Sequence, residues 1–308
     1  MQELISIILP IFIILVTGYL IKTIRLIDST FISSINKALY NFFLPLLLFY
    51  EIKEADYSKI PSMYILFIAI LSICLIFCLS LIASKILGIN RNESFSITMN
   101  SFRGNYAYMG LPVSYFFFGD QGITIAAIYM AFIVPFVNIL SVICLTLGST
   151  DKINLRKMFI TAVLNPIVIG CTVGFVCLFL SISLPDSINK SINILSRVTM
   201  PLALICIGGG INISLIKGNI ASIILVVLFK LFILPVIALL LIYLSKLDFN
   251  DYTEVLLIML ASPCATVNYV LAISLGGSVK LTTSVIILTT LLSIFVYPFW
   301  YSIIQYFL

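Results

Sequence analysis

Long apolar runs, separated by short polar stretches, recur along the whole chain of 308 residues. Each run has about the 20 residues that a helix needs to cross a hydrocarbon core roughly 30 Å thick. Helices are expected because lipid offers no hydrogen-bond partners, so a spanning segment must satisfy its own backbone. The pattern predicts an all-α polytopic membrane protein with ten spans, at 3–21, 31–50, 61–84, 94–118, 122–147, 158–181, 191–212, 220–245, 254–275 and 281–306.

Composition supports a membrane protein and argues against a soluble domain. Apolar residues make up 62% of the chain and charged residues 9%, whereas soluble domains carry about 25% charged residues. The mean hydropathy is +1.22. The opening stretch MQELISIILPIFIILV has no basic region and no small-residue cleavage site. We therefore interpret it as the first span rather than as a signal peptide.

Basic residues are divided unequally between the two sets of predicted loops. Loops after odd-numbered spans hold nine, namely Lys22, Arg25, Lys85, Arg91, Lys152, Arg156, Lys157, Lys217 and Lys280. The opposite loops hold four, namely Lys53, Lys59, Lys190 and Lys246. Because basic loops remain in the cytoplasm, we expect a cytoplasmic-membrane protein with both termini outside. The net charge of +5 then reflects topology, and its scatter over short loops indicates no nucleic-acid partner.

Proline, glycine and asparagine positions recur between the two halves of the chain. The first three matches, displaced by 156 residues, are Pro10 with Pro166, Gly18 with Gly174 and Pro45 with Pro201. The next three, displaced by 163 residues, are Asn105 with Asn268, Tyr106 with Tyr269 and Pro135 with Pro298. Unless these matches are coincidental, one net insertion of seven residues relates two repeats, 1–150 with spans 1–5 and 151–308 with spans 6–10. An odd number of spans per repeat inverts the second repeat, as in many secondary transporters.

Spans 4 and 9 each contain a proline beside small and polar residues. Pro112 deprives the Tyr108 carbonyl of its helical partner, and Pro263 does the same to the Met259 carbonyl. Unpaired backbone at membrane depth is tolerated only where protein or a wet cavity surrounds it. We expect both spans to be broken helices, with simple proline kinks as the alternative.

The charges embedded deep in the predicted spans are basic, namely Arg103 in span 4 and Lys230 in span 8, and Lys37 and Arg197 lie nearer span ends. The chain has no histidine, and no aspartate or glutamate falls near a span centre. A buried cation without an anionic partner is costly. A substrate carboxylate can supply that partner, helped by a helix N-terminus exposed at a break. The alternative is that either side chain reaches back to the membrane interface.

Neutral residues near the breaks complete the candidate site. Asn105 and Asn268 match each other in the repeat, and an asparagine can both donate to a carboxylate and accept from a substrate. Tyr106 and Tyr269 are candidates for an amphipathic wall of the site. The seven cysteines all fall within spans and have no metal-ligand spacing, so we expect them to pack as small apolar side chains. Neither a metal, a cofactor nor an enzymatic dyad is predicted.

Six stretches together resemble the auxin efflux carrier family, which contains plant PIN-FORMED carriers and bacterial organic-acid permeases. They are ALYNFFLPLLLF (38–49), FRGNYAYMGLPVSYFFFGDQG (102–122), NPIVIGCTVGF (165–175), MPLALICIGGGI (200–211), KLFILPVIALL (230–240) and ASPCATVNYVLA (261–272). Each stretch is weakly specific, but the six follow one another in family order. One departure is Ala107, which stands where the family pattern has glycine.

This resemblance implies ten helices in two inverted five-helix repeats, with helices 4 and 9 crossing as broken helices at the substrate site. It further implies a scaffold domain that usually forms a homodimer and a transport domain that moves as an elevator. Carried over by position, the crossover residues are Asn105, Gly110, Pro112, Pro263 and Asn268. Shared architecture with sodium–bile acid symporters leaves sodium coupling open.

The sequence thus predicts a secondary transporter of small organic anions, with carboxylates as the expected class. The expected substrate-binding residues are Arg103, Asn105, Tyr106, Gly110, Pro112, Lys230, Ser262, Pro263, Thr266, Asn268 and Tyr269. We expect efflux driven by the anion gradient and the membrane potential. The alternatives are a sodium- or proton-coupled symporter and an anion channel.

Overall fold

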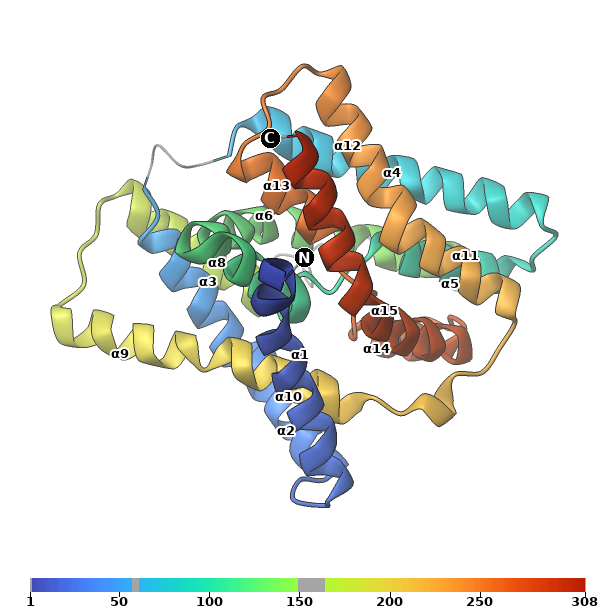
Figure 1. The fold of residues 1–308 in the computed structure, drawn as a ribbon, viewed down its shortest axis with the longest axis horizontal. Helices are drawn as coiled ribbons and strands as arrows, with labels where there is room; N and C mark the ends of the chain where they lie inside the picture. Colours follow the sequence, from blue (N-terminus) through green and yellow to red (C-terminus); the bar gives the residue numbers. More distant parts are fainter. Residues whose placement is uncertain (1, 57–60, 149–163, 308) are drawn as a thin grey trace. The chain divides into compact units, whose positions relative to one another are not determined.

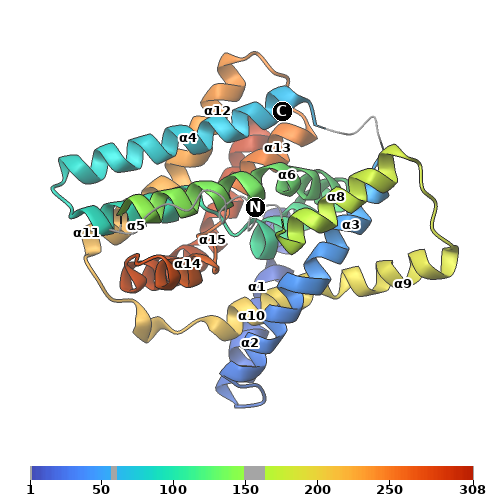
Figure 2. The same cartoon turned by 180° about the vertical axis from the view of Figure 1, so that it is seen from behind.

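The computed structural model describes residues 2–56, 61–148 and 164–307, and Figures 1 and 2 show it from opposite sides. The chain forms two compact units, each built from three separate segments. Unit 1 comprises Met1–Pro61, Ala107–Phe132 and Val163–Ile211, and unit 2 comprises Ser62–Tyr106, Ile133–Ala162 and Asn212–Leu308. Each unit therefore draws on both halves of the sequence. Lys59, Lys152, Arg156 and Lys157, which contribute to the predicted orientation, lie outside the described residues.

Helices lie in all ten predicted ranges, as far as these ranges fall within the described residues. By length and composition, six helical stretches of the described chain can cross a membrane: Ser29–Lys53, Met63–Ile86, Tyr106–Gly148, Asp186–Gly210, Ile220–Leu244 and Val279–Phe307. Leu9–Thr23 and Pro166–Phe179 are shorter apolar helices. These findings confirm a polytopic helical protein, and the number of ten spans remains a prediction.

Unit 1 pairs helices that are distant in sequence. Its elements are α1 (Gln2–Thr23), α2 (Ser29–Ala38), the π-helical turn η1 (Leu39–Phe43), α3 (Leu44–Lys53), the first part of α6 (Leu111–Gly148), α8 (Pro166–Phe179), α9 (Asp186–Arg197) and α10 (Thr199–Gly210). Helix α1 lies along α10, and α3 lies along α8 (Figures 1 and 2). Within α6, Gly119 has φ 63° and ψ −153°, so the two predicted spans meet there.

Glycines set the close approach of these helix pairs. A Cβ at Gly18 would overlap the Ile205 carbonyl, and a Cβ at Gly174 would lie 3.0 Å from the Phe49 carbonyl oxygen. The displacement of 156 residues that relates the prolines also relates these two contacts, because Gly18 corresponds to Gly174 and Phe49 corresponds to Ile205. At the far end of the first pair, Lys22 Nζ donates to the Gly209 carbonyl at 2.6 Å.

Unit 2 contains the interruptions of both spans, residues 103–105 and 261–267. Its elements are α4 (Met63–Ile86), α5 (Arg91–Phe102), the last part of α6, the short turn η4 (Ile213–Leu215), α11 (Ile220–Leu228), the π-helical turn η5 (Phe229–Ile233), α12 (Leu234–Leu244), α13 (Asp251–Leu260), α14 (Asn268–Ser274) and α15 (Val279–Phe307). Helix α5 packs against α4, α11 and α15. The π-helical turn η3 (Tyr106–Gly110) follows α5 and contains the boundary between the units.

Each of the three π-helical turns ends two residues before a proline, namely Pro45, Pro112 and Pro235. Proline lacks an N–H and its ring crowds the carbonyl four residues earlier, and a wider turn at that point relieves both problems. The helix therefore continues through Pro112. We expected the fourth span to break near Pro112, but its non-helical residues are 103–105, closer to the start of the span.

Replacing Gly208 with alanine should destabilise unit 1, because the added Cβ would overlap the Leu15 carbonyl. Overpacking costs about 1–3 kcal/mol, more than the roughly 1 kcal/mol that alanine gains over glycine in a helix. We expect a melting temperature several degrees below wild type for the purified protein in detergent. Gly210→Ala is the matched control, since a Cβ there meets nothing within 4 Å. Equal melting temperatures for the two variants would contradict the glycine-mediated contact.

Candidate functional site

The two interrupted spans cross in unit 2, where the backbone groups that lack helical hydrogen bonds in one break bind those in the other. The Asn105 N–H donates to the Pro263 carbonyl at 2.7 Å, and the Ala265 N–H donates to the Arg103 carbonyl at 3.2 Å. Between these bonds, Gly104 and Cys264 form an isolated antiparallel bridge. Buried backbone groups must find partners, so each break satisfies what the other leaves open.

The two breaks differ in length. Helix α5 ends at Phe102 and η3 begins at Tyr106, whereas α13 ends at Leu260 and α14 begins at Asn268. The asparagines that cap α5 and α13, Asn90 and Asn250, are 160 residues apart, as are the bridged residues Gly104 and Cys264. Beyond the crossing, Tyr106 and Tyr269 are 163 apart. The displacement between the repeats thus rises from 156 to 160 before the crossing and from 160 to 163 within the second break. The seven extra residues, which we expected as one insertion, are therefore divided into four before the crossing and three inside the second break.

Lys230 brings a positive charge to this crossing. Its side chain is fully buried, and its Nζ donates to the Leu260 carbonyl at 2.7 Å. Leu260 ends α13, where helix carbonyls lack intrahelical partners and the helix dipole favours a cation. The ammonium also lies 5.7 Å from the centroid of the Tyr106 ring, a cation–π distance. A Cβ at Gly104 would lie only 2.9 Å from Nζ, so glycine at this position makes room for the ammonium.

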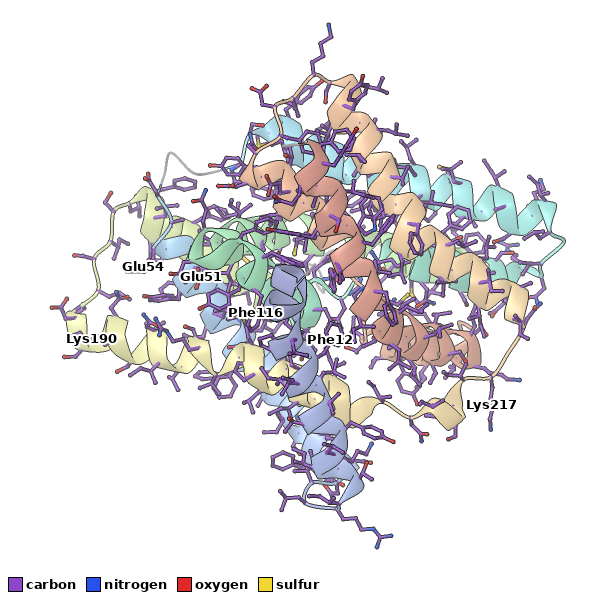
Figure 3. The ribbon with its side chains drawn as sticks, in the orientation of Figure 1. Phe12, Glu51, Glu54, Phe116, Lys190 and Lys217 are labelled. Carbon is purple, nitrogen blue, oxygen red and sulfur yellow. The ribbon has the colours of Figure 1, made fainter. Side chains whose placement is uncertain are left out.

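Lys230 has no acidic partner in the part of the chain that the structure describes, where the salt bridge found is Lys53–Glu54. Glu51 lies in α3 of unit 1, and Glu54 caps the C-terminus of that helix (Figure 3). Trp300 Nε1 donates to the Leu231 carbonyl at 2.8 Å and fixes the π-helical turn that carries Lys230. The structure therefore holds a desolvated cation beside two helix breaks.

Arg103, the other embedded cation, directs its guanidinium toward α6. Its Nη1 donates to the Val137 carbonyl and to Ser141 Oγ, each at 3.0 Å, and its Nη2 donates to Asn138 Oδ1 at 2.5 Å. All three acceptors are neutral, so this arginine is bound without a carboxylate. We expected a substrate to be the acceptor for Arg103, and this part of the protein already supplies three.

A buried amide chain orients Asn268. Its Nδ2 donates to Asn100 Oδ1 at 3.0 Å, and Asn100 Nδ2 donates in turn to Thr282 Oγ1 at 3.0 Å and to the Ser96 carbonyl at 2.8 Å. Asn268 Oδ1 is buried and has no donor among the described residues. The orientation leaves a hydrogen-bond acceptor available. Sequence reasoning missed Asn100 and Thr282, although the density of polar residues in 94–101 was a usable signal.

The remaining candidate residues fall into two groups. Asn105 and Tyr106 are buried at the crossing, where Tyr106 Oη donates to the Phe102 carbonyl at 3.2 Å. Ser262, Pro263 and Thr266 lie in the second break.

The other group lies away from the crossing or in the other unit. Tyr269 is 43% exposed. Gly110 and Pro112 belong to unit 1.

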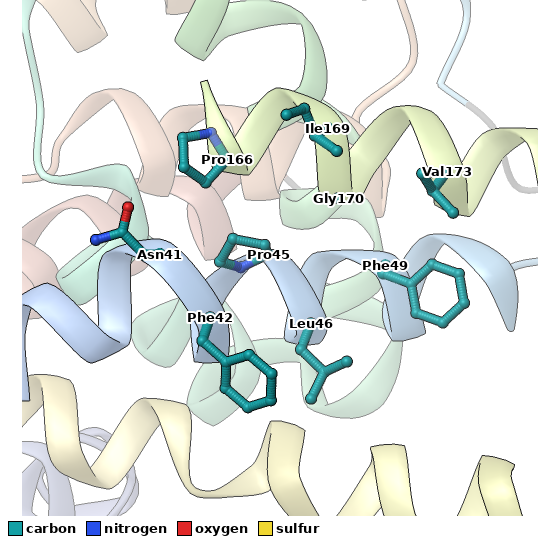
Figure 4. A pocket seen from close by; sticks show the side chains of 9 residues that line it. All are labelled: Asn41, Phe42, Pro45, Leu46, Phe49, Pro166, Ile169, Gly170 and Val173. Carbon is teal, nitrogen blue, oxygen red and sulfur yellow. The ribbon is translucent and has the colours of Figure 1, made fainter. Parts of the chain in front are cut away.

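An apolar groove in unit 1 is the alternative binding cavity. It has a volume of about 460 Å³ and runs between α3 and α8 (Figure 4). Its lining is Asn41, Phe42, Pro45, Leu46, Phe49, Pro166, Ile169, Gly170 and Val173. Asn41 is the polar residue of this set and none is charged, so the groove does not match the chemistry of an anion.

The chain is similar to known transport proteins over nearly its whole length. A family model described as "Membrane transport protein" matches residues 4–301. An uncharacterized transporter of Methanothermobacter thermautotrophicus is 24% identical over 296 residues, which cover 95% of this chain and 96% of that protein. An uncharacterized transporter of Methanocaldococcus jannaschii is 25% identical over 304 residues, covering 96% and 97% respectively.

Arg103→Met should destabilise the protein because three hydrogen bonds to α6 are lost. Hydrogen bonds to charged groups contribute about 1.5–3 kcal/mol each, so we expect the melting temperature to fall by several degrees. Arg91→Met is the matched control, because exposed Arg91 also binds α6, through one bond from Nε to the Leu147 carbonyl at 3.0 Å. A stable Arg103→Met variant with weakened anion binding would instead assign Arg103 to the substrate.

Proposed function

The chain belongs to the membrane transport protein family, the auxin efflux carrier-like family that its motifs resemble, and we propose that it transports small organic anions. The expected substrates are carboxylates, and the expected location is the cytoplasmic membrane with both termini outside. The proposed binding site is the crossing of the two broken spans in unit 2. The family is a transport family, so carriage across the membrane rather than catalysis is the activity.

The observation that carries the proposal is the buried ammonium of Lys230. Removing a cation from water is costly unless an anion compensates it. One carbonyl and one aromatic face stabilise this ammonium, but neither neutralises its charge. A substrate carboxylate would do so, and the crossing would gain a charge-assisted hydrogen bond when the substrate binds.

Neutral groups at the crossing would complete the recognition of the substrate. Asn268 presents a fixed acceptor through Oδ1, which suits a substrate that also carries an N–H or O–H donor. Tyr106 would form an amphipathic wall, and Asn105, Ser262 and Thr266 would supply further polar contacts. Arg103 would contribute positive potential from its guanidinium, which is bound against α6.

Alternating access by elevator movement of a transport domain against a dimerised scaffold is the mechanism that the resemblance implies. Two inverted repeats, 1–150 and 151–308, are its architectural basis. The glycine contacts related by 156 residues and the breaks related by 160 support this repeat. The interleaving of both halves in each compact unit supports it further.

Uncoupled efflux is the preferred energetic scheme, and a sodium symporter is the main alternative. A sodium site at the breaks would need free carbonyl oxygens. The carbonyls of Arg103, Leu260 and Pro263 already accept from protein donors, and one of these donors is the Lys230 ammonium. Proton coupling is the further alternative, and the chain has no histidine that could relay the proton.

Thermal-shift titration of the purified protein with a panel of mono- and dicarboxylates would test the proposal, since a bound ligand raises apparent stability. Lys230→Met should weaken anion binding about ten- to a hundredfold, the equivalent of one charge-assisted hydrogen bond of roughly 1.5–3 kcal/mol. Lys230→Arg should recover part of the affinity.

Lys22→Met is the matched control, because Lys22 also donates to a helix-end carbonyl, that of Gly209 in unit 1. It should bind carboxylates as wild type does. Wild-type affinity in Lys230→Met would contradict the site. Transport without saturation or counterflow of labelled substrate would favour a channel over a carrier.

A further inference from the structure

From the geometry around Lys230 we infer that this carrier exchanges one anion for another much faster than it moves anions in one direction. The inference rests on the proposed function, because it requires an anion at the crossing. It concerns the step in which the site returns without cargo, which the fold of the family does not specify.

The charge of the site differs between its loaded and its empty form. Lys230 is fully buried and its described neighbours include no carboxylate. A bound monocarboxylate would bring the ammonium and its partner to zero net charge. After release, a protonated Lys230 carries one positive charge that no described carboxylate compensates.

The ammonium is not positioned to leave the crossing between turnovers. Its Nζ is tied to the last carbonyl of α13 and lies against the Tyr106 ring, in the space left by the missing side chain of Gly104. The Trp300 bond to the Leu231 carbonyl holds the adjacent backbone. The positive charge therefore stays with the site when the site changes sides.

Moving an uncompensated charge through hydrocarbon slows the empty return relative to the loaded step. The free-energy penalty for a cation at the centre of a bilayer corresponds to a rate lower by on the order of a hundredfold. Protein groups and water offset part of this penalty. We therefore expect exchange to exceed net flux by at least about tenfold. A single elementary charge that crosses a potential of about 100 mV is biased by up to about fiftyfold, so an inside-negative potential accelerates the empty return after efflux.

The test uses the full-length protein in proteoliposomes loaded with radiolabelled lactate or radiolabelled succinate, with sodium and pH equal on both sides. Efflux is measured into buffer without organic anion and into buffer that contains the same unlabelled anion. With lactate, whose single carboxylate neutralises the ammonium, wild type and the Lys22→Met control should show at least tenfold faster efflux into the anion-containing buffer. An imposed inside-negative potential should accelerate net lactate efflux and leave lactate exchange nearly unchanged.

Lys230→Met leaves the empty site uncharged and makes the lactate-loaded site negative, so the loaded step limits both exchange and net efflux. The ratio of exchange to net efflux should therefore fall toward one, even if both rates are low. Equal exchange and net rates in wild type would overturn the inference while leaving the anion carrier intact. Net efflux that does not respond to the potential would also overturn it. Failure to transport either labelled anion, together with no thermal shift from any carboxylate, would instead contradict the proposed function.

Discussion

The mutual pairing of two interrupted helices is the interaction on which the rest of this structure depends. A hydrocarbon core offers no partners for free N–H and C=O groups, so one broken span alone would be unstable. Here the N–H of Asn105 binds the Pro263 carbonyl and the N–H of Ala265 binds the Arg103 carbonyl. This reciprocal pairing places two helix ends and their side chains at one point inside unit 2. A binding site at membrane depth becomes possible because the broken segments satisfy each other.

The charge of the crossing gives that site its chemistry. Lys230 lies where α13 ends, beside Tyr106 and Gly104, and its ammonium is stabilised there without being neutralised. Arg103 shows the contrasting solution, a cation whose Nη1 and Nη2 bind three neutral acceptors of α6. Arg103 thus has a structural role, whereas the charge of Lys230 suits an anionic cargo. The family provides transport as the activity, and this distribution of charge supports an organic anion as the cargo.

Sequence reasoning located the helices well because apolar length and membrane thickness leave few choices. It placed one break correctly at Pro263 but put the other near Pro112, since a π-helical turn that absorbs a proline has no clear sequence signal. Arg103 and Lys230 both lie about ten residues into their predicted spans, so depth alone does not show which of the two cations is available to a substrate. The groups that the side chains of Arg103 and Lys230 contact depend on tertiary packing. The same packing brings Asn100 into contact with Asn268, and Thr282 into contact with Asn100. The polar content of 94–101 was the signal that pointed to this hidden amide chain.

The most direct measurement is a cryo-electron microscopy structure of the protein with a transported carboxylate bound. The account predicts a carboxylate oxygen at hydrogen-bond distance from Lys230 Nζ, about 2.7–3.2 Å, with a substrate donor near Asn268 Oδ1. It also predicts that the guanidinium of Arg103 remains bound to α6. A carboxylate bound to Arg103 instead, or located in the apolar groove between α3 and α8, would contradict the assignment of the crossing as the anion site.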